Sequence, residues 1–329
     1  WAYVVDASTG TIASPGTRPS AVIVSVVNLD NHVVRGDAIL SAEQERFLKG
    51  IARIRSLFPD TPMHFAIPQP DSELSRRLIA ELPSDGSVSL LRVPMRYGLD
   101  KPAILARMAG CKPSREPVWF IRAEGVVAIE NALESRRPVT RRISAIGGPG
   151  ANAPRHIDVL LGHPVDLLVK PSPDYRIIRG GVMQGEIITS GTGVAIGTQG
   201  LTVLPHLQER KLLGFARPGW RTRSCSRWFL SALRRWFPED HTTGLRGERR
   251  ACVACGLCRK VCPAGLWPQW IHKALFSGDV AEAQLLGLDL CVGCGLCTYA
   301  CPAKLELSRD FRDGQDGAAK EASSTGAIS

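Results

Sequence analysis

The first third of the chain alternates short apolar runs with longer stretches of helical periodicity. Three apolar runs predict strands: residues 21–27, which we expect to be buried, 63–67 and 88–93. Residues 41–57 and 71–82 predict helices, the first of them amphipathic and opened by a capping box of Ser41 and Gln44. Strands that alternate with helices predict an α/β layer with a parallel sheet. The strand ends carry neither a GxGxxG nor a GxxxxGK[ST] loop, so this layer has no nucleotide-binding signature of its own.

Residues 139–188 have a different sequence pattern, in which glycine turns separate short predicted strands. We expect strands at residues 141–146 and 176–179, each followed by a glycine turn, and a short helix over residues 157–168. Phosphate-binding loops are also rich in glycine. Because no Lys, Ser or Thr stands at a helix entry after these glycines, we interpret them as structural turns.

Eight of the ten cysteines fall into two runs with the same spacing, Cys-x2-Cys-x2-Cys-x3-Cys-Pro. This spacing is typical of domains with two [4Fe–4S] clusters, where the fourth cysteine of each run binds the other cluster. The predicted ligands of cluster one are Cys252, Cys255, Cys258 and Cys301. Those of cluster two are Cys291, Cys294, Cys297 and Cys262. Glycines between the cysteines (Gly256, Gly293 and Gly295) let the backbone turn tightly and point amides at sulfur.

A zinc site and a disulfide framework fit these cysteines less well. A structural zinc site normally uses two CxxC pairs or a mixture of Cys and His, and needs no third cysteine or Cys-Pro in each run. Disulfide frameworks belong to small secreted domains, whereas this chain is large. Exposed clusters survive best in a reducing compartment, which favours the cytoplasm. The isolated Cys111 and Cys225 are interpreted as buried or incidental thiols, and His272 as a packing or surface histidine rather than a ligand.

The 28 residues between the two runs are more than a compact bacterial ferredoxin usually holds. Residues 270–276 and 279–286 predict helices that stop at Gly278 and Gly287. We therefore expect a helical cluster domain, of the kind that usually sits inside multi-subunit electron-transfer enzymes. The tail, residues 311–329, is rich in Gly, Ala and Ser and is expected to be disordered.

Composition and length describe a globular protein of about two domains. The chain has 329 residues, of which 44% are hydrophobic and 22% charged, and no apolar run reaches the ~18 residues of a membrane-spanning helix. It begins with Trp1 rather than Met and residues 1–8 lack a secretory signal pattern, so we expect the natural N-terminus to lie upstream.

The positive charge is concentrated in one segment. Residues 209–250 contain eleven Lys or Arg and four acids, which accounts for 11 − 4 = +7 of the net charge of +10. Aromatic residues are interleaved with these arginines: in residues 226–237, Phe229, Leu233 and Trp236 follow helical spacing. We interpret the segment as an amphipathic surface that docks onto a membrane complex. A solvated basic face and a nucleic-acid grip remain alternatives.

Several stretches in a fixed order give the chain a resemblance to the A subunit of the bacterial sodium-translocating NADH:quinone oxidoreductase (Nqr), a relative of the C subunit of the Rnf complex. They are residues 119–129, 146–149, 177–185, 213–227, 275–287 and 297–302. The resemblance implies a Rossmann-like α/β layer and a β-grasp module of the kind that binds soluble ligands, before an α-helical ferredoxin domain. We place these at residues 1–136, 137–204 and 251–310, with the basic docking segment at 205–250.

Two departures limit this resemblance. The A subunit of Nqr does not keep the full set of cluster ligands, whereas this chain has all eight cysteines, as the C subunit of Rnf does. In that Rnf subunit and its relatives in respiratory complex I, a glycine-rich loop and an acidic strand end hold FMN and NADH. That loop would fall at or before Trp1, and residues 28–32 lack the paired glutamates, so we expect no FMN in this chain.

The combined expectation is a non-autonomous electron-transfer subunit of an oxidoreductase of the NADH:quinone or NADH:ferredoxin type. It would relay electrons through two [4Fe–4S] clusters, and the resemblance adds coupling to NADH, ubiquinone and ion transport. Its partners would be integral-membrane and redox subunits of the same complex, on the cytoplasmic face of the inner membrane. No acid–base pair or nucleophile stands out. The alternatives are a component of a soluble iron–sulfur oxidoreductase and a nucleic-acid-binding protein with structural clusters.

Overall fold

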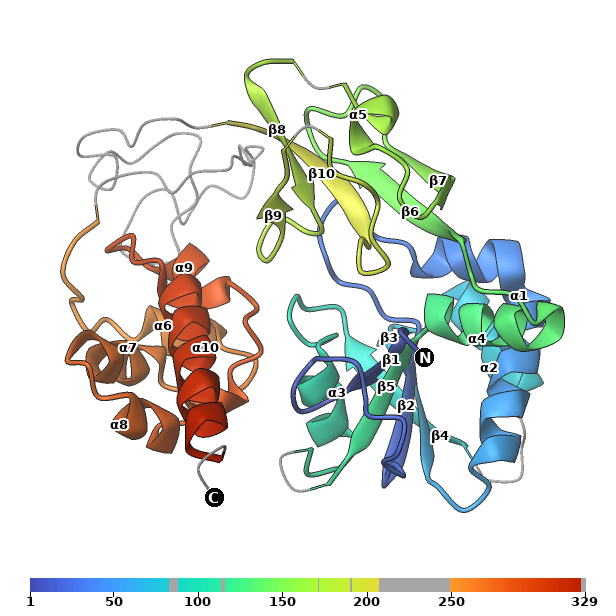
Figure 1. The fold of residues 1–329 in the computed structure, drawn as a ribbon, viewed down its shortest axis with the longest axis horizontal. Helices are drawn as coiled ribbons and strands as arrows, with labels where there is room; N and C mark the ends of the chain where they lie inside the picture. The colour runs from blue at the N-terminus through green and yellow to red at the C-terminus, as the bar shows by residue number, and fades with distance from the viewer. Residues whose placement is uncertain (83–87, 114–115, 171, 190, 207–248, 327–329) are drawn as a thin grey trace. The chain divides into compact units, whose positions relative to one another are not determined.

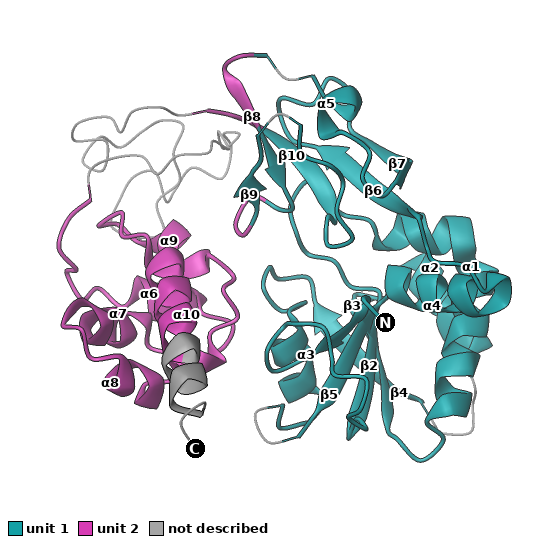
Figure 2. Cartoon of the chain, viewed as in Figure 1, with its two compact units in different colours: residues 1–172, 177–181, 185–203 teal, residues 173–176, 182–184, 204–329 magenta. Residues whose placement is uncertain are grey.

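The computed structural model describes residues 1–82, 88–113, 116–170, 172–189, 191–206 and 249–326 (Figure 1). The chain divides into two compact units (Figure 2). Unit 1 comprises residues 1–172, 177–181 and 185–203, and unit 2 comprises residues 173–176, 182–184 and 204–329. Unit 1 holds most of two β-sheets, and unit 2 holds a C-terminal group of helices, so the chain is a mixed α/β protein with a helical region.

The first sheet has five strands in the order β1-β5-β2-β3-β4. Their bounds are β1 Val4–Asp6, β2 Ala21–Ser25, β3 Met63–Gln69, β4 Val88–Pro94 and β5 Val118–Arg122. β2 pairs in parallel with both β3 and β5, β3 pairs in parallel with β4, and β1 closes the edge antiparallel to β5. The three strands predicted from apolar runs are therefore confirmed, and the sheet is parallel apart from β1.

Helices cover both faces of this sheet, which explains why its central strands are apolar at successive positions. The helices are α1 Gly36–Leu57, α2 Glu73–Glu81, α3 Pro102–Met108 and α4 Ala123–Ser135. Val22 and Val24 of β2 belong to the core under α1, α2 and α4, whereas Ile23 belongs to the core under α3 (Figure 1). Both faces of the sheet are thus withdrawn from water at its central strands.

The predicted start of the first long helix is wrong. α1 begins at Gly36 instead of Ser41, and Ser41 lies inside it. The backbone of Glu43 is not helical (φ −135°, ψ 30°), so α1 is kinked there. In contrast, α2 has a polar cap: the Ser72 side chain accepts a hydrogen bond from the backbone amide of Ser75.

The second sheet also has five strands, in the order β7-β6-β10-β8-β9. Their bounds are β6 Arg141–Gly147, β7 Arg155–Leu160, β8 Tyr175–Arg179, β9 Glu186–Ile187 and β10 Gly200–Pro205. β6 pairs antiparallel with β7 and parallel with β10, and β8 pairs antiparallel with β9. The sheet is therefore mixed, and the strands expected around residues 141–146 and 176–179 are present.

The helix expected over residues 157–168 is only partly correct. Residues 157–160 belong to β7, and only Val165–Leu168 form a helix, α5. The strand forms because residues 155–160 form a ladder with β6, in which Asp158 faces Ile143 and the Arg141 side chain lies 2.9 Å from the Asp158 carboxylate. Cross-strand pairing therefore overrides the local pattern.

A buried group of three charged side chains joins the elements of unit 1. Arg35 precedes α1, Glu124 lies in the first turn of α4, and Arg142 lies on β6. Arg35 donates to both carboxylate oxygens of Glu124, through Nη2 at 2.9 Å, and Arg142 Nη2 donates to Glu124 Oε2 at 2.6 Å. Burial alone would raise the pKa of Glu124, but the charges and hydrogen bonds of the two arginines outweigh it and hold that pKa below its usual value.

Unit 2 contains five α-helices among its described residues. They are α6 Leu257–Val261, α7 Pro268–Phe276, α8 Val280–Leu285, α9 Leu296–Ala300 and α10 Leu307–Gly326, and a 3-10 turn, Leu288–Leu290, precedes the second cysteine run. The two helices predicted between the cysteine runs are confirmed as α7 and α8. Gly278 and Gly287, the predicted stops, have positive φ angles of 80° and 91°.

The expectation of disorder from residue 311 onward is wrong for residues 311–326, because they continue α10. Phe311 is buried in the core of unit 2, and Gly314 lies against the side chain of Leu275. The Gln315 side chain donates to the backbone carbonyls of Leu288 and Cys291. Small residues in this segment therefore allow close packing of a helix.

The basic segment at residues 205–250 falls almost entirely outside the described part of the chain, which resumes at Arg249. Its predicted amphipathic stretch and Cys225 therefore lie outside the described residues. None of the described helices combines the length and the apolar character that crossing a membrane requires.

Candidate metal centre

The two cysteine runs have the same local structure. In each run the third cysteine lies in a five-residue helix, Cys258 in α6 and Cys297 in α9, and the fourth cysteine caps the end of that helix. Each helix is preceded by a glycine with positive φ, Gly256 (70°) and Gly295 (80°). A residue with a Cβ atom rarely adopts this conformation, so the glycines are the local reason that the chain can turn into each helix.

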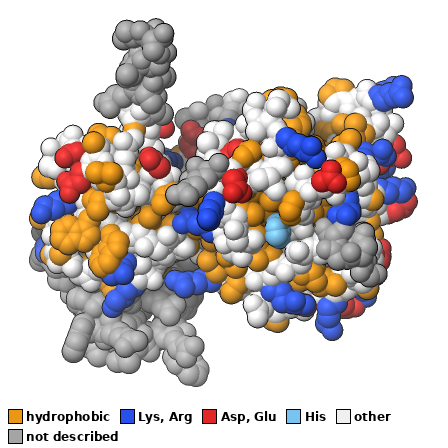
Figure 3. Space-filling model, turned by 90° about the horizontal axis from the view of Figure 1, so that it is seen from below, with side chains coloured by type: hydrophobic (Ala, Val, Ile, Leu, Met, Phe, Trp, Pro, Cys, Tyr) orange, Lys and Arg blue, Asp and Glu red, His pale blue; other side chains and the backbone are white. Residues whose placement is uncertain are grey.

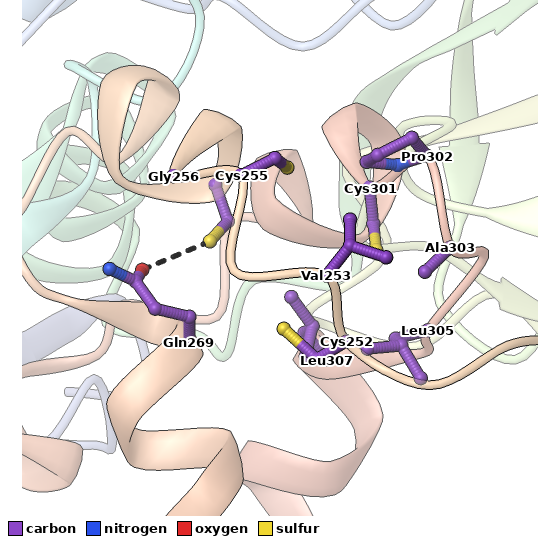
Figure 4. A pocket seen from close by; sticks show the side chains of 11 residues that line it. Cys252, Val253, Cys255, Gly256, Gln269, Cys301, Pro302, Ala303, Leu305 and Leu307 are labelled. Carbon is purple, nitrogen blue, oxygen red and sulfur yellow. Dashed lines mark hydrogen bonds between the residues drawn. The ribbon is translucent and has the colours of Figure 1, made fainter.

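Four cysteines surround one hollow, of about 350 Å³, in unit 2. They are Cys252, Cys255, Cys258 and Cys301, so three come from the first run and one from the second. Figure 4 shows Cys252, Cys255 and Cys301 arranged around this space. Most of the other lining side chains are apolar, among them Val253, Leu305 and Leu307. The structure thus brings together the set that the sequence assigned to cluster one.

The other four cysteines also influence one another. Burial is the largest cause that raises the pKa of Cys291, to about 11, and the charges of Cys294 and Cys262 raise it further. Burial likewise raises the pKa of Cys297, with contributions from Cys291, Cys294 and Cys262. Electrostatic effects of this size act over short distances. Cys262 of the first run also packs, with Cys291, against the core that contains Cys297.

Hydrogen-bond donors and acceptors reach the sulfur atoms from the surrounding backbone and from one side chain. Burial raises the pKa of Cys258, while the backbone amides of Arg259 and Gln269 act in the opposite direction. Amides of Gly293 and Thr298 act in the same way on Cys291 and Cys297. The Cys258 thiol donates to Gln269 Oε1 at 3.3 Å (Figure 4).

The two groups differ in exposure to solvent. Cys252 and Cys255 of the first group are exposed, and Cys258 and Cys301 are buried. In the second group no cysteine is exposed: Cys294 and Cys297 are buried, and Cys291 and Cys262 are half-buried. Among the described residues, no three His, Cys, Asp or Glu side chains converge on a single metal ion. In the first group the sulfur atoms line a volume, which suits a multi-iron cluster.

Two residues that the sequence singled out lie outside these groups. His272 is buried in α7, and its Nδ1 lies 3.3 Å from the carboxylate of Asp310 on α10, which fits the packing role expected for it. Cys111 is half-buried in unit 1, where burial raises its pKa. Gln269 was not predicted to reach a cysteine. Gln269 directly follows Pro268 in the first turn of α7. This position does not by itself predict a contact with Cys258, because the contact depends on where α7 lies in the fold.

A family model described as a 4Fe-4S dicluster domain matches residues 251–306, which contain all eight cysteines of the two runs. Among solved structures, an NAD+-reducing [NiFe]-hydrogenase aligns with 13% identity and a TM-score of 0.44, covering 58% of this chain and 41% of that one. A likeness of this size carries no argument about fold or function.

Curated relatives are named as the A subunit of Na(+)-translocating NADH-quinone reductase. The protein from Rhodopirellula baltica is 32% identical over 176 residues, and that from Shewanella denitrificans is 32% identical over 233 residues. The protein from Alcanivorax borkumensis is 26% identical over 293 residues, or 87% of this chain. The chain spans only 39%, 51% and 63% of these relatives, respectively. The chain is therefore a homologue of proteins named as the A subunit of Na(+)-translocating NADH-quinone reductase, and it carries a 4Fe-4S dicluster domain.

Proposed function

We propose that the chain is an electron-transfer subunit that holds two [4Fe–4S] clusters. The first would be bound by Cys252, Cys255, Cys258 and Cys301, and the second by Cys291, Cys294, Cys297 and Cys262. The observation that supports the proposal is that Cys301 of the second run lines one hollow together with Cys252, Cys255 and Cys258 of the first. Each cluster, when bound, would accept and release one electron at a time.

The residues of the chain would position and tune these clusters. The backbone amides of Arg259, Gly293 and Thr298 act on cysteine sulfurs, and hydrogen bonds to sulfur are among the factors that set a cluster's reduction potential. Apolar side chains around the first hollow exclude water from one side of it. Because the buried thiols favour the protonated form, metal binding would release their protons.

We further propose that the chain acts inside an oxidoreductase complex of the NADH:quinone type, as a peripheral component on the cytoplasmic side of the membrane. The names of its relatives support this, and with it coupling to ion transport. Integral-membrane and redox subunits would be its partners, with residues 209–250 as a docking surface. In this proposal the first sheet and its helices are a Rossmann-like layer without FMN, and the second sheet is a β-grasp module.

Anaerobic purification from the native host, with and without detergent, tests both levels of the proposal. We expect iron and acid-labile sulfide in equal amounts, about eight of each per chain, no flavin, and hydrophobic subunits that co-purify in detergent. Zinc in place of iron would contradict the electron-transfer role. Iron without membrane partners would favour a soluble oxidoreductase, and salt-dependent binding of DNA or RNA would favour a nucleic-acid protein.

A further inference from the structure

The two cysteine runs lie in segments of opposite charge. Residues 249–278, around the first run, contain five cations and no acid: Arg249, Arg250, Arg259, Lys260 and Lys273. Residues 279–303, around the second run, contain three acids and no cation: Asp279, Glu282 and Asp289. All eight of these residues are exposed. Asp310 of α10 lies 3.9 Å from Arg249 and offsets one of the positive charges. The helical unit is therefore positive around one cysteine run and negative around the other.

This charge difference adds to the difference in exposure between the two cysteine groups. Reduction adds a negative charge to an iron–sulfur cluster, so nearby cations and access to water both favour the reduced form. The first group has both, because Cys252 and Cys255 are exposed and Arg259 and Lys260 directly follow Cys258. In the second group no cysteine is exposed and Asp289 lies two residues before Cys291, but Lys260 also lies two residues before Cys262, so sequence neighbours do not leave this group without a cation. The difference in exposure therefore places the potential of the first group above that of the second, and Arg259, which directly follows Cys258, acts in the same direction.

An exposed aromatic surface lies next to the first group. We call it the α6–α7 face and define it by Val253, Arg259, Lys260, Trp267, Trp270 and Lys273. Trp267 and Trp270 are 42% and 48% exposed, although large aromatic side chains are usually covered. The Arg259 guanidinium lies 3.2 Å from the centre of the Trp267 ring, and the Lys273 ammonium lies 5.7 Å from that of Trp270. Figure 3 shows hydrophobic and basic side chains side by side on the molecular surface.

This face has the composition of a protein docking site and a direct link to the hollow of the first group. Tryptophan and arginine are the residues most enriched at the energetic centres of protein interfaces. Val253 is 69% exposed and also lines the hollow beside Cys252 and Cys255. The cations of the face select a partner of opposite charge, because complementary charge speeds up and orients encounters between proteins.

We propose that the first cysteine group is the outlet of the chain, where electrons leave for an acceptor protein with an acidic surface that docks on the α6–α7 face. This inference rests on the proposed function as a two-cluster carrier. Electrons would arrive at the second group, which has the lower potential. In each transfer the first group gives up one electron and the acceptor, an oxidised one-electron carrier, gains it, with no bond made or broken.

The order of the potentials is tested by redox titration with low-temperature EPR. A Cys255→Ser variant identifies the signal of the first group, and Cys294→Ser that of the second. We expect the one-electron-reduced protein to hold its electron on the first group in about tenfold excess, which corresponds to 59 mV. The variant Arg259→Gln should lower the first potential more than the second, and Asp289→Asn should raise the second more than the first. Reduction of the second group first would overturn the proposal.

The docking surface is tested with two one-electron oxidants of opposite charge, tris(oxalato)cobaltate(III) and hexaamminecobalt(III). We expect the anionic complex to oxidise the reduced protein with a rate that falls as salt rises, because the attraction is screened. Poly-L-glutamate should inhibit this reaction, and the Arg259→Gln/Lys260→Gln variant should lose both effects while its reaction with the cationic complex speeds up or is unchanged. Equal responses of the variant and the wild type would overturn the proposal.

Two further outcomes separate this proposal from its competitors. In the first, the wild type binds phosphatidylglycerol vesicles and the Trp267→Ala/Trp270→Ala variant does not. The α6–α7 face would then bind a membrane surface instead of an acidic protein, and the proposal would be overturned. Iron and sulfide analysis of the wild type and of every variant shows whether the clusters are bound at all. If the wild type binds no iron, the proposed function fails. If it binds both clusters and their potentials are reversed, only the outlet fails.

Discussion

The two units of the chain use chemically active side chains in opposite ways. In unit 1 the charged groups form ion pairs: Glu124 lies between Arg35 and Arg142, so every charge in this buried group has a partner of opposite sign. In unit 2 the cysteines are part of the core, since Cys258, Cys297 and Cys301 pack with Leu288 and Phe311 among others. The thiols of Cys258 and Cys301, however, also line a hollow.

This difference indicates what stabilises each unit. Unit 1 has two sheets and apolar cores on both faces of the first one, so it can fold without a cofactor. The helical region of unit 2 is small, and domains of this size often need metal to be stable. We therefore interpret the convergence of side chains as structural in unit 1, where opposite charges pair, and as a binding site in unit 2, where sulfur atoms line a hollow.

The largest expected effect is the selective unfolding of unit 2 when iron is removed. After anaerobic treatment with a chelator, we expect helices α6 to α9 to lose their protection from hydrogen–deuterium exchange, while the strands of the first sheet keep theirs. Cluster binding contributes to folding only in the unit that holds the ligands. Equal protection of both units after iron removal would show that the helical unit is stable without metal.

A large loss of stability, in unit 1 instead of unit 2, is expected from Glu124→Gln. Removing one partner of a buried ion pair leaves an uncompensated charge and costs about 3–5 kcal/mol. The free energy of unfolding of unit 1 should fall by this amount, measured by denaturant titration, while iron content and EPR signals stay unchanged. Glu134→Gln, in the same helix, is the control, and we expect it to change stability by less than about 0.5 kcal/mol. Loss of iron in Glu124→Gln would mean that the two units are not separate.

The same residue makes the stability of unit 1 depend on pH. Because the pKa of Glu124 is lower in the folded state, its contribution is fully present above the unfolded value of about 4.3 and is lost as pH falls through the lower folded value. The hydrogen-exchange protection of peptides that cover α4 and β6, expressed relative to the intrinsic exchange rate at each pH, should therefore fall on acidification below about pH 4.3. In Glu124→Gln this part of the pH dependence should disappear. An unchanged profile would show that other carboxylates cause it.

The smallest expected effect tests the packing of α10 in unit 2. Gly317→Ala should stabilise the unit by about 0.5–1 kcal/mol, because alanine favours helix and there is open space at that position. Gly314→Ala gains the same helix propensity, but its Cβ would lie 2.9 Å from Leu275 Cδ2, so the gain should be offset or reversed. Thermal unfolding of the two holoproteins measures the difference. Equal gains would contradict the close contact between α10 and α7.

Much of this fold follows from local patterns, and the remainder depends on contacts between distant residues. The runs that became β2 and β3 are apolar because both faces of the sheet are covered there, so their apolar pattern identified them. β7 was missed because its pairing with β6, and not its own sequence, makes it a strand. α10 was missed because its glycines indicate disorder unless Leu275 lies beside them.

The candidate site shows the same division. The spacing of the cysteines predicts all eight ligands, because a cluster fixes the distances between its ligands within each run, and the structure brings four of them together around one hollow. The contact from Gln269 to Cys258 depends on where α7 lies, and the spacing contains no information about it. Arg35, Glu124 and Arg142 are far apart in the sequence, so only the folded chain reveals that they form one group.

The central claim is that two clusters share the two runs in the crossed arrangement. Its most direct test is low-temperature EPR with iron analysis on dithionite-reduced wild type, Cys301→Ala and Cys262→Ala. We predict a spin-coupled two-cluster signal in the wild type, and about half of the iron with a single uncoupled signal in each variant. The signal that survives in Cys301→Ala should be sensitive to Cys294→Ser, and that in Cys262→Ala to Cys255→Ser. The opposite sensitivities, in which each variant loses the cluster of its own run, would contradict the account.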